Sequence, residues 1–131
     1  MTRFVVDCET LLRIAAGELE VAPAHQLVAP TLVRSQALAA LYEAARRGEI
    51  TRAEGLERVR RINSLKVRFL GDKVLQQQAW KVAEELGWKT TYAAEYVALT
   101  KLQADALVTS DPELARAVSG LVKTETLDAL R

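Results

Sequence analysis

Short apolar runs that alternate with helical segments are the feature that most restricts how this chain can fold. Runs rich in β-branched and aromatic residues are predicted as strands at 3–6, 25–30, 65–71, 106–109 and 121–124. The segments between them have helical spacing. Strands this short and apolar are buried on both faces, so the alternation predicts an α/β protein with a mostly parallel sheet covered by helices on each side.

Capping signals mark where the helices begin. Thr51 and Glu54 form the pattern of a capping box, in which each side chain bonds to the backbone of the other residue. Asp72 is predicted to open the next helix, and Thr31 is expected to cap the one before. The segment 90–103 is predicted to be an amphipathic helix.

Composition narrows the class of protein. The 131 residues suit a single domain, and a net charge of +1 argues against a strongly basic nucleic-acid-binding face. A single histidine, His25, rules out a multi-histidine metal site, and a single cysteine, Cys8, fits a reducing cytosol. No apolar run approaches the roughly 18 residues of a membrane span, and the first residues are too acidic for a signal peptide. We therefore expect a cytoplasmic protein with no membrane partner.

Two aspartates follow predicted strands at their carboxyl ends. Asp7 comes directly after the first strand, and Asp111 follows the strand at 106–109. Ligands of open parallel sheets bind beyond these ends, where the strand order reverses. Two carboxylates brought together there repel each other unless a cation or a proton compensates. Because oxygen ligands favour Mg²⁺ or Mn²⁺ over Zn²⁺, the sequence predicts a metal site at Asp7 and Asp111.

Each aspartate also has a purely structural interpretation. Asp111 is followed by Pro112 and Glu113, which is the usual order of cap, first residue and first turn of a helix. Capping does not exclude metal binding. A charged residue directly after a buried strand, such as Asp7, can equally be the start of a loop.

Four segments occur in a characteristic order along the chain. They are FVVDCETLL near the start, APTLVRSQALAAL at 29–41, TTYAAEYVALTKLQADALVTSD at 90–111, and ELARAV after it. This order resembles that of the PIN-domain nucleases, and most of all the VapC toxins of bacterial toxin–antitoxin pairs. The resemblance covers nearly the whole chain and rests on order and spacing, since no single motif is specific. It implies one PIN-like domain over residues 1–131, built as a three-layer α/β/α sandwich.

The resemblance also implies an activity, a cofactor and partners. Its acidic pocket would bind Mg²⁺ or Mn²⁺ and hydrolyse the phosphodiesters of single-stranded or structured RNA. The usual partner is a small VapB-like antitoxin, and homodimers are common. The predicted function is therefore a metal-dependent endoribonuclease toxin.

The family's site residues match this sequence only in part. The first acid matches Asp7, and the last, in a T-x-D pattern, matches Asp111 with Thr109 as a neighbouring threonine. The second acid position holds Gln36, and the third, after a tyrosine, holds Ala93. Gln36 can still coordinate through its amide oxygen or hold a metal-bound water, although it brings no charge. Ala93 can do neither. Two of the four expected acids are absent.

Two glutamates lie near the gaps in sequence. Glu95 is two residues past Ala93, a rotation of about 200° on a helix, so we expect it on nearly the opposite face. Glu9 is two residues past Asp7, where the family often has a small hydroxyl residue close to the metal. Glu9 could restore one missing charge, or it could be a first-turn glutamate favoured by the helix dipole.

Aromatic and basic residues give weaker signals. Aromatic side chains can stack on bases, although at helical spacing they more often belong to the core or to an interface. A run of arginines could follow an RNA backbone, although a solvated face is its commoner meaning. The aromatic candidates are Tyr92, Tyr96, Trp80 and Trp88, and the arginines are Arg46, Arg47, Arg52, Arg58, Arg60 and Arg61.

Two other classes of function remain open. With Gln36 and Ala93 in place of acids, the chain could be a catalytically inactive PIN-like protein that binds RNA or an antitoxin, because fewer carboxylates bind Mg²⁺ more weakly. A phospho-accepting receiver-like domain also gathers acids at strand ends. Asp7 and Glu9 loosely fit its paired acid, but no strand in the middle of the chain ends in an acceptor aspartate.

Overall fold

Five parallel strands form one sheet in the computed structural model, which describes residues 1–131. The strands follow the order β3-β2-β1-β4-β5, and every neighbouring pair is parallel. The predicted parallel sheet is thus confirmed. The strands are β1 (Thr2–Val6), β2 (His25–Pro30), β3 (Val67–Leu70), β4 (Ala106–Val108) and β5 (Thr124–Glu125).

The last strand lies later than predicted. It begins at Thr124, whereas the apolar pattern placed it at 121–124. The amides of Leu121 and Val122 both donate to the carbonyl of Val118, so these residues turn back on the preceding helix instead of joining the sheet.

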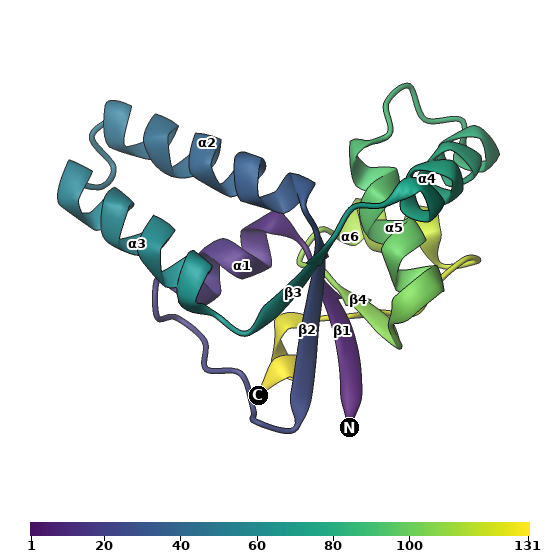
Figure 1. Ribbon diagram of the computed structural model, residues 1–131, viewed down its shortest axis with the longest axis horizontal. Helices are drawn as coiled ribbons and strands as arrows, with labels where there is room; N and C mark the ends of the chain where they lie inside the picture. The colour runs from purple at the N-terminus through teal and green to yellow at the C-terminus, as the bar shows by residue number, and fades with distance from the viewer.

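Helices cover both faces of the sheet. In Figure 1, α1, α2 and α3 lie on one side, and α4, α5 and α6 lie on the other. This three-layer α/β/α arrangement confirms the predicted fold class. No helix is both long enough and apolar enough to cross a membrane. The helices are α1 (Cys8–Ala15), α2 (Leu32–Arg46), α3 (Arg52–Ser64), α4 (Lys73–Leu86), α5 (Tyr92–Gln103), α6 (Pro112–Val118) and a short 3₁₀ helix (Leu127–Leu130).

Helix α5 is buried on more sides than the sequence predicted. Ala94 and every residue from Tyr96 to Thr100 are buried, so the helix has no wide polar face. The prediction of an amphipathic helix is wrong because α5 packs between β1, β2 and β4 on one side and α4 on the other. Its first turn is therefore held firmly at the edge of the sheet.

The helix caps agree with the sequence at two of three positions. Thr51 and Glu54 form both bonds of the capping box, and Asp72 accepts a bond from the amide of Leu75 at 2.9 Å. Thr31 makes no capping bond, contrary to expectation. Its φ and ψ of −56° and −28° are already helical, whereas a capping residue usually has extended backbone.

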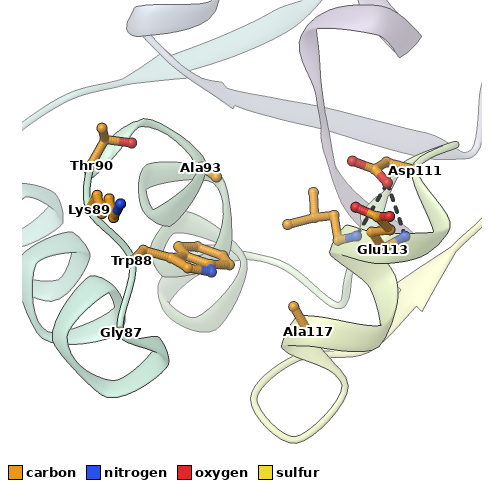
Figure 2. Close-up of a pocket in the computed structure, with 9 residues that line it drawn as sticks. Gly87, Trp88, Lys89, Thr90, Ala93, Asp111, Glu113 and Ala117 are labelled. Carbon is orange, nitrogen blue, oxygen red and sulfur yellow. Dashed lines mark hydrogen bonds between the residues drawn. The ribbon is translucent and has the colours of Figure 1, made fainter.

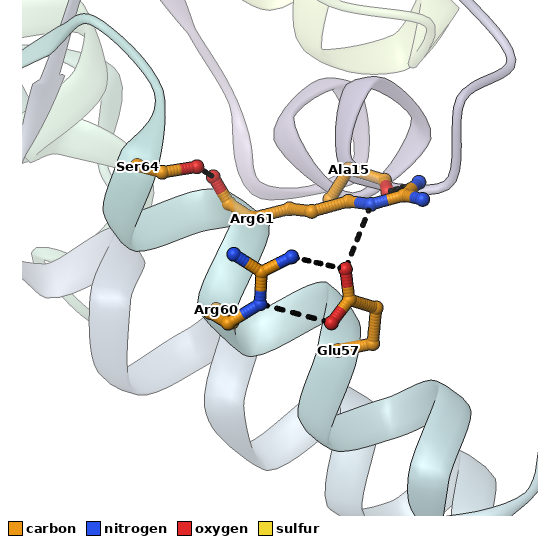
Figure 3. A network of polar contacts seen from close by, with 5 residues as sticks. All are labelled: Ala15, Glu57, Arg60, Arg61 and Ser64. Atoms are coloured by element: carbon orange, nitrogen blue, oxygen red, sulfur yellow. Dashed lines mark hydrogen bonds and ion pairs between the residues drawn. The ribbon is translucent and has the colours of Figure 1, made fainter.

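An arginine joins α3 to the end of α1. Nη1 of Arg61 donates to the carbonyl of Ala15 at 3.1 Å, which satisfies an acceptor that the helix itself leaves free. Glu57 pairs with both Arg60 and Arg61, at 2.5 Å and 3.4 Å (Figure 3). Part of the basic run is thus neutralised by a neighbouring acid and serves to pack two helices.

Candidate functional site

The two aspartates lie at the same edge of the sheet. Strands β1 and β4 are neighbours, with Val6 paired to Val108. Asp7 follows Val6 directly, and Asp111 comes three residues after Val108. Since β1 is the central strand and the helices change sides on either side of it, this edge is the point where ligands bind in open α/β sheets.

Each aspartate caps a helix with one oxygen. Oδ1 of Asp7 accepts from the amide of Thr10 at 2.9 Å, at the start of α1. Oδ1 of Asp111 accepts from the amides of Glu113 and Leu114 at 2.9 and 3.3 Å, at the start of α6. Oδ2 of both aspartates has no hydrogen bond within the protein. The structural and the metal-binding interpretations are therefore compatible, because they use different oxygens.

Thr109 positions the second aspartate. Its side chain is buried, and Oγ1 accepts a bond from the amide of Asp111 at 3.1 Å. This contact fixes the turn between β4 and α6. Thr109 thus holds the turn that carries Asp111.

Two hollows meet above this edge of the sheet. The first, here called the α2 hollow, has a volume of about 620 Å³. The second, the α6 hollow, measures 590 Å³. The α2 hollow is lined by Asp7, Cys8, Glu9, Gln36, Ala39, Ala40, Glu43, Thr90, Tyr92, Ala93, Tyr96 and Leu114, and the α6 hollow by Gly87, Trp88, Lys89, Thr90, Ala93, Asp111, Glu113, Leu114 and Ala117.

Ala93 lies where the two hollows join. It lines both of them, together with Thr90 and Leu114. Figure 2 shows Ala93 and Asp111 on opposite sides of the α6 hollow. The four sequence-predicted site residues thus border two adjoining hollows, with Asp7 and Gln36 in one, Asp111 in the other and Ala93 in both.

Gln36 is held by a tyrosine from the other side of the sheet. The hydroxyl of Tyr96 donates to Oε1 of Gln36 at 2.5 Å. Burial is the main cause that raises the pKa of Tyr96, and the electrostatic effects of Cys8, Asp7 and Glu95 raise it further. The hydroxyl therefore stays protonated and remains a donor.

Glu9 lines the α2 hollow, but both of its oxygens are engaged. Oε1 accepts from Arg13 at 3.1 Å, one turn along α1, and Oε2 accepts from the hydroxyl of Ser110 at 3.0 Å. The bond to Ser110 ties the start of α1 to the loop that carries Asp111. Through this bond, Glu9 links the segment that carries Asp7 to the segment that carries Asp111.

Glu95 does not line either hollow. It is half-buried, and burial raises the pKa of its carboxyl group. The helical rotation that separates it from Ala93 accounts for its absence from the site. Glu95 therefore does not replace the missing acid.

The pKa of Cys8 reflects both its burial and the negative charges beside it in the α2 hollow. Burial, followed by the charges of Asp7 and Glu9, raises the pKa of its thiol from 9.0 to about 11. A thiol with such a pKa is protonated at neutral pH and is a poor nucleophile. Cys8 is thus a packing residue at the edge of the site.

Aromatic residues from the sequence prediction separate into two groups. Trp88, Tyr92 and Tyr96 line the hollows, Tyr96 with only 5% of its surface exposed, whereas Trp80 lies on the outer surface of α4. The loop between α4 and α5 also brings Lys89 to the site, which sequence reasoning passed over. Its place in the sequence, shortly before Tyr92 and Ala93, was the signal that could have indicated it.

The donor set suits a loosely held cation. No group of three or more His, Cys, Asp or Glu side chains is arranged to hold a metal ion, so protein ligands alone do not enclose one. Mg²⁺, however, commonly keeps several waters and is bound by one or two carboxylates together with substrate phosphates. The free Oδ2 atoms of Asp7 and Asp111 fit that mode.

Comparisons with known proteins bear on the fold. No protein-family model and no curated protein sequence matches the chain. PAE2754 from Pyrobaculum aerophilum superposes with a TM-score of 0.75 at 26% identity, covering 98% of this chain and 92% of that one. VapBC2 from Rickettsia felis, bound to a DNA fragment from their promoter, gives 0.66 at 9% identity, covering 95% and 98%. VapBC-1 from nontypeable Haemophilus influenzae gives 0.57 at 9%, covering 96% and 98%.

These similarities define a PIN-like three-layer α/β/α fold, as the sequence predicted. The VapBC structures and this chain share that fold over almost their full lengths. At 9% identity, they establish a common architecture and not a common activity.

Proposed function

We propose that this chain is a VapC-type endoribonuclease that depends on Mg²⁺ or Mn²⁺ and is weakened or silenced by the alanine at position 93. The observation that carries the proposal is the place of Ala93, at the junction of two hollows that hold Asp7 and Asp111. The VapBC structures of the same fold and the family resemblance of the sequence support it.

In this proposal the free oxygens of Asp7 and Asp111 hold the cation. When bound, Mg²⁺ or Mn²⁺ would help to activate water as the nucleophile and would offset the negative charge that builds up on the scissile phosphate. The protein's own part is to fix these carboxylates, and the capping bonds at Oδ1 do so. The amide of Gln36, held by Tyr96, orients a water or a phosphate oxygen beside them.

The missing acid also favours a second function. A protein with only two acids in reach of a cation binds it more weakly, because the affinity for hard cations depends on ligand charge. Without the cation, the same depression can bind RNA or an antitoxin and leave the phosphodiester intact. The carboxylates of Asp7 and Asp111 would then pair with an arginine of a VapB-like antitoxin. A homodimer is part of the same proposal.

Restoring the acid separates the two functions. Ala93 is the second residue of α5, where an aspartate interacts favourably with the helix dipole, so Ala93→Asp should fold. We expect the restored chain to cleave RNA with Mn²⁺ and the original chain to cleave it far more slowly. If neither chain cuts any RNA and neither binds Mn²⁺ by calorimetry, the nuclease proposal fails.

The matched control uses the first aspartate. Asp7→Asn keeps an oxygen that can cap α1 but removes the charge, so it should abolish cleavage in the Ala93→Asp background while leaving the fold intact. Retained cleavage would overturn the assignment of Asp7. Added EDTA should stop the restored enzyme, and added Mn²⁺ should restart it.

A further inference from the structure

The α6 hollow contains groups that the proposed chemistry does not use. Beyond Asp111 and Ala93, the residues that line it include Trp88, Lys89 and the apolar Leu114 and Ala117. Figure 2 shows Trp88 on the wall that faces α6. An aromatic face, a cation and an apolar floor in one hollow next to a carboxylate site form a surface suited to a nucleotide.

Trp88 is fixed before any ligand arrives. Gly87 ends α4 with a positive φ of 68°, and the amide of Trp88 donates to the carbonyl of Ala83 at 2.9 Å. This is the bonding of a Schellman motif, which sets the direction in which the chain leaves the helix. The indole is half-buried and packs against the core, so one part of the ring is anchored while another lines the hollow.

Lys89 supplies a free positive charge beside the indole. It forms no ion pair with any carboxylate of the chain. Glu113 lines the same hollow, and together with Asp111 it would repel an anion placed at their end. A phosphate is therefore favoured at the Lys89 end, and the apolar and aromatic walls are left for a base.

We propose that the α6 hollow is a nucleotide subsite, in which Trp88 stacks on a base of the RNA strand and Lys89 binds an adjacent phosphate. The inference rests on the proposed function, because the α6 hollow adjoins the α2 hollow and shares Thr90, Ala93 and Leu114 with it. A phosphodiester beside Asp7 and Asp111 places its neighbouring nucleotide in the α6 hollow. Base stacking on aromatic side chains tolerates any base, so Trp88 sets the strand's path more than its sequence.

The two tryptophans of the chain allow a direct test. Trp80→Phe leaves Trp88 as the only indole, and Trp88→Phe leaves Trp80, which lies in a separate surface depression on α4. Each variant is titrated with a short single-stranded RNA in EDTA, so that no cleavage occurs. We expect saturable quenching of the fluorescence in Trp80→Phe and no change in Trp88→Phe. An RNA duplex should not quench Trp88, because its paired bases cannot stack on the indole.

Affinity gives a second measurement. Binding of fluorescently labelled RNA, followed by anisotropy, should weaken roughly tenfold in Trp88→Leu and much less in Trp88→Phe, which keeps an aromatic face. Lys89→Gln should reduce the slope of log affinity against log salt concentration by about 0.7, the value for one phosphate contact on a single strand. Trp80→Leu is the matched control and should bind as the parent does.

The outcomes separate this inference from the nuclease proposal. If RNA binds but Trp88 is not quenched and Trp88→Leu binds normally, the subsite is wrong, whatever the restored enzyme does. If Ala93→Asp cleaves RNA and adding Trp88→Leu leaves KM unchanged, the subsite is also wrong while the nuclease proposal stands. Quenching of Trp88 with no cleavage by Ala93→Asp would support the subsite and favour the binding function over the nuclease.

Discussion

The hydroxyl of Tyr96 in α5 bonds to the amide oxygen of Gln36 in α2, and this contact joins helices that lie on opposite sides of the sheet (Figure 1). It passes beyond the carboxyl end of β1, directly beside the α2 hollow that both residues line. The position of Gln36 is therefore set by a residue 60 positions away in the sequence.

Removing this hydroxyl should reduce stability. Tyr96→Phe leaves the ring in place and deletes the donor to Gln36, which should lower the free energy of unfolding by about 1 kcal/mol. Tyr92→Phe is the control, since Tyr92 is exposed and its hydroxyl makes no hydrogen bond within the protein, and it should stay within about 0.5 kcal/mol of the parent. Urea denaturation measures both. Equal effects would show that the contact contributes nothing.

A carboxylate at position 36 should strengthen cation binding. In Gln36→Glu the hydroxyl of Tyr96 can still donate, now to a charged acceptor, and its raised pKa keeps it protonated. In the Ala93→Asp background we expect Mn²⁺ to bind at least about tenfold more tightly, which corresponds to about 1.4 kcal/mol. Calorimetry with Mn²⁺ tests this. Unchanged affinity would remove position 36 from the cation site.

The two roles of Asp111 should separate by substitution. Asp111→Asn keeps a capping oxygen for the amides of Glu113 and Leu114, so stability should change little, whereas Asp111→Ala should cost about 1 kcal/mol. In the restored background both should lose Mn²⁺-dependent cleavage, because both lack the charge. Thermal denaturation and a cleavage assay on the same samples make the comparison. Cleavage by Asp111→Asn would contradict the metal-binding role.

The thiol of Cys8 should react slowly. At pH 8 and in EDTA, a pKa of about 11 leaves the thiolate fraction about a hundredfold below that of an unfolded chain, so alkylation by iodoacetamide should be slower by about that factor or more. Because folding raises this pKa, its stabilising contribution is complete below 9.0 and is lost as the pH rises from 9.0 to about 11. Mass spectrometry follows the reaction.

A substitution next to Cys8 tests the electrostatic part of this shift. Asp7→Asn removes the neighbouring charge that has the larger effect on Cys8 and should lower the pKa of the thiol, so alkylation should become faster than in the parent. Arg13→Gln serves as a control on α1 that leaves both carboxylates in place. If the folded parent were alkylated as fast as the unfolded chain, the burial of Cys8 would be contradicted.

Much of the fold could be predicted from the sequence because its signals are local. The strand at Thr2–Val6, the capping box at Thr51 and the capping aspartate at the start of α6 each depend on residues within a few positions of one another. The failed cap at Thr31 shows where local patterns end. Its amide bonds to the carbonyl of Leu70 in a neighbouring strand, so a tertiary contact sets its backbone.

The site was predictable only as a set of positions. Strand ends and family order indicated Asp7, Gln36, Ala93 and Asp111, and the structure places all four around two adjoining hollows. Contacts between distant segments, such as the bond from Ser110 to the glutamate of α1, are not encoded in any local pattern. The junction of the two hollows depends on how α5 packs against the sheet, which periodicity alone described wrongly.

Each of the two aspartates caps a helix as well as bordering the site, so the site residues differ in how well they tolerate substitution. Replacing Asp7 or Asp111 by a residue without a capping oxygen, such as alanine, also removes a helix cap and so lowers stability. An alanine at position 93 has no such cost in stability, since alanine is the best helix former and no bond depends on a carboxylate there. A change of an acid to alanine at position 93 would therefore leave the fold and both capping aspartates intact.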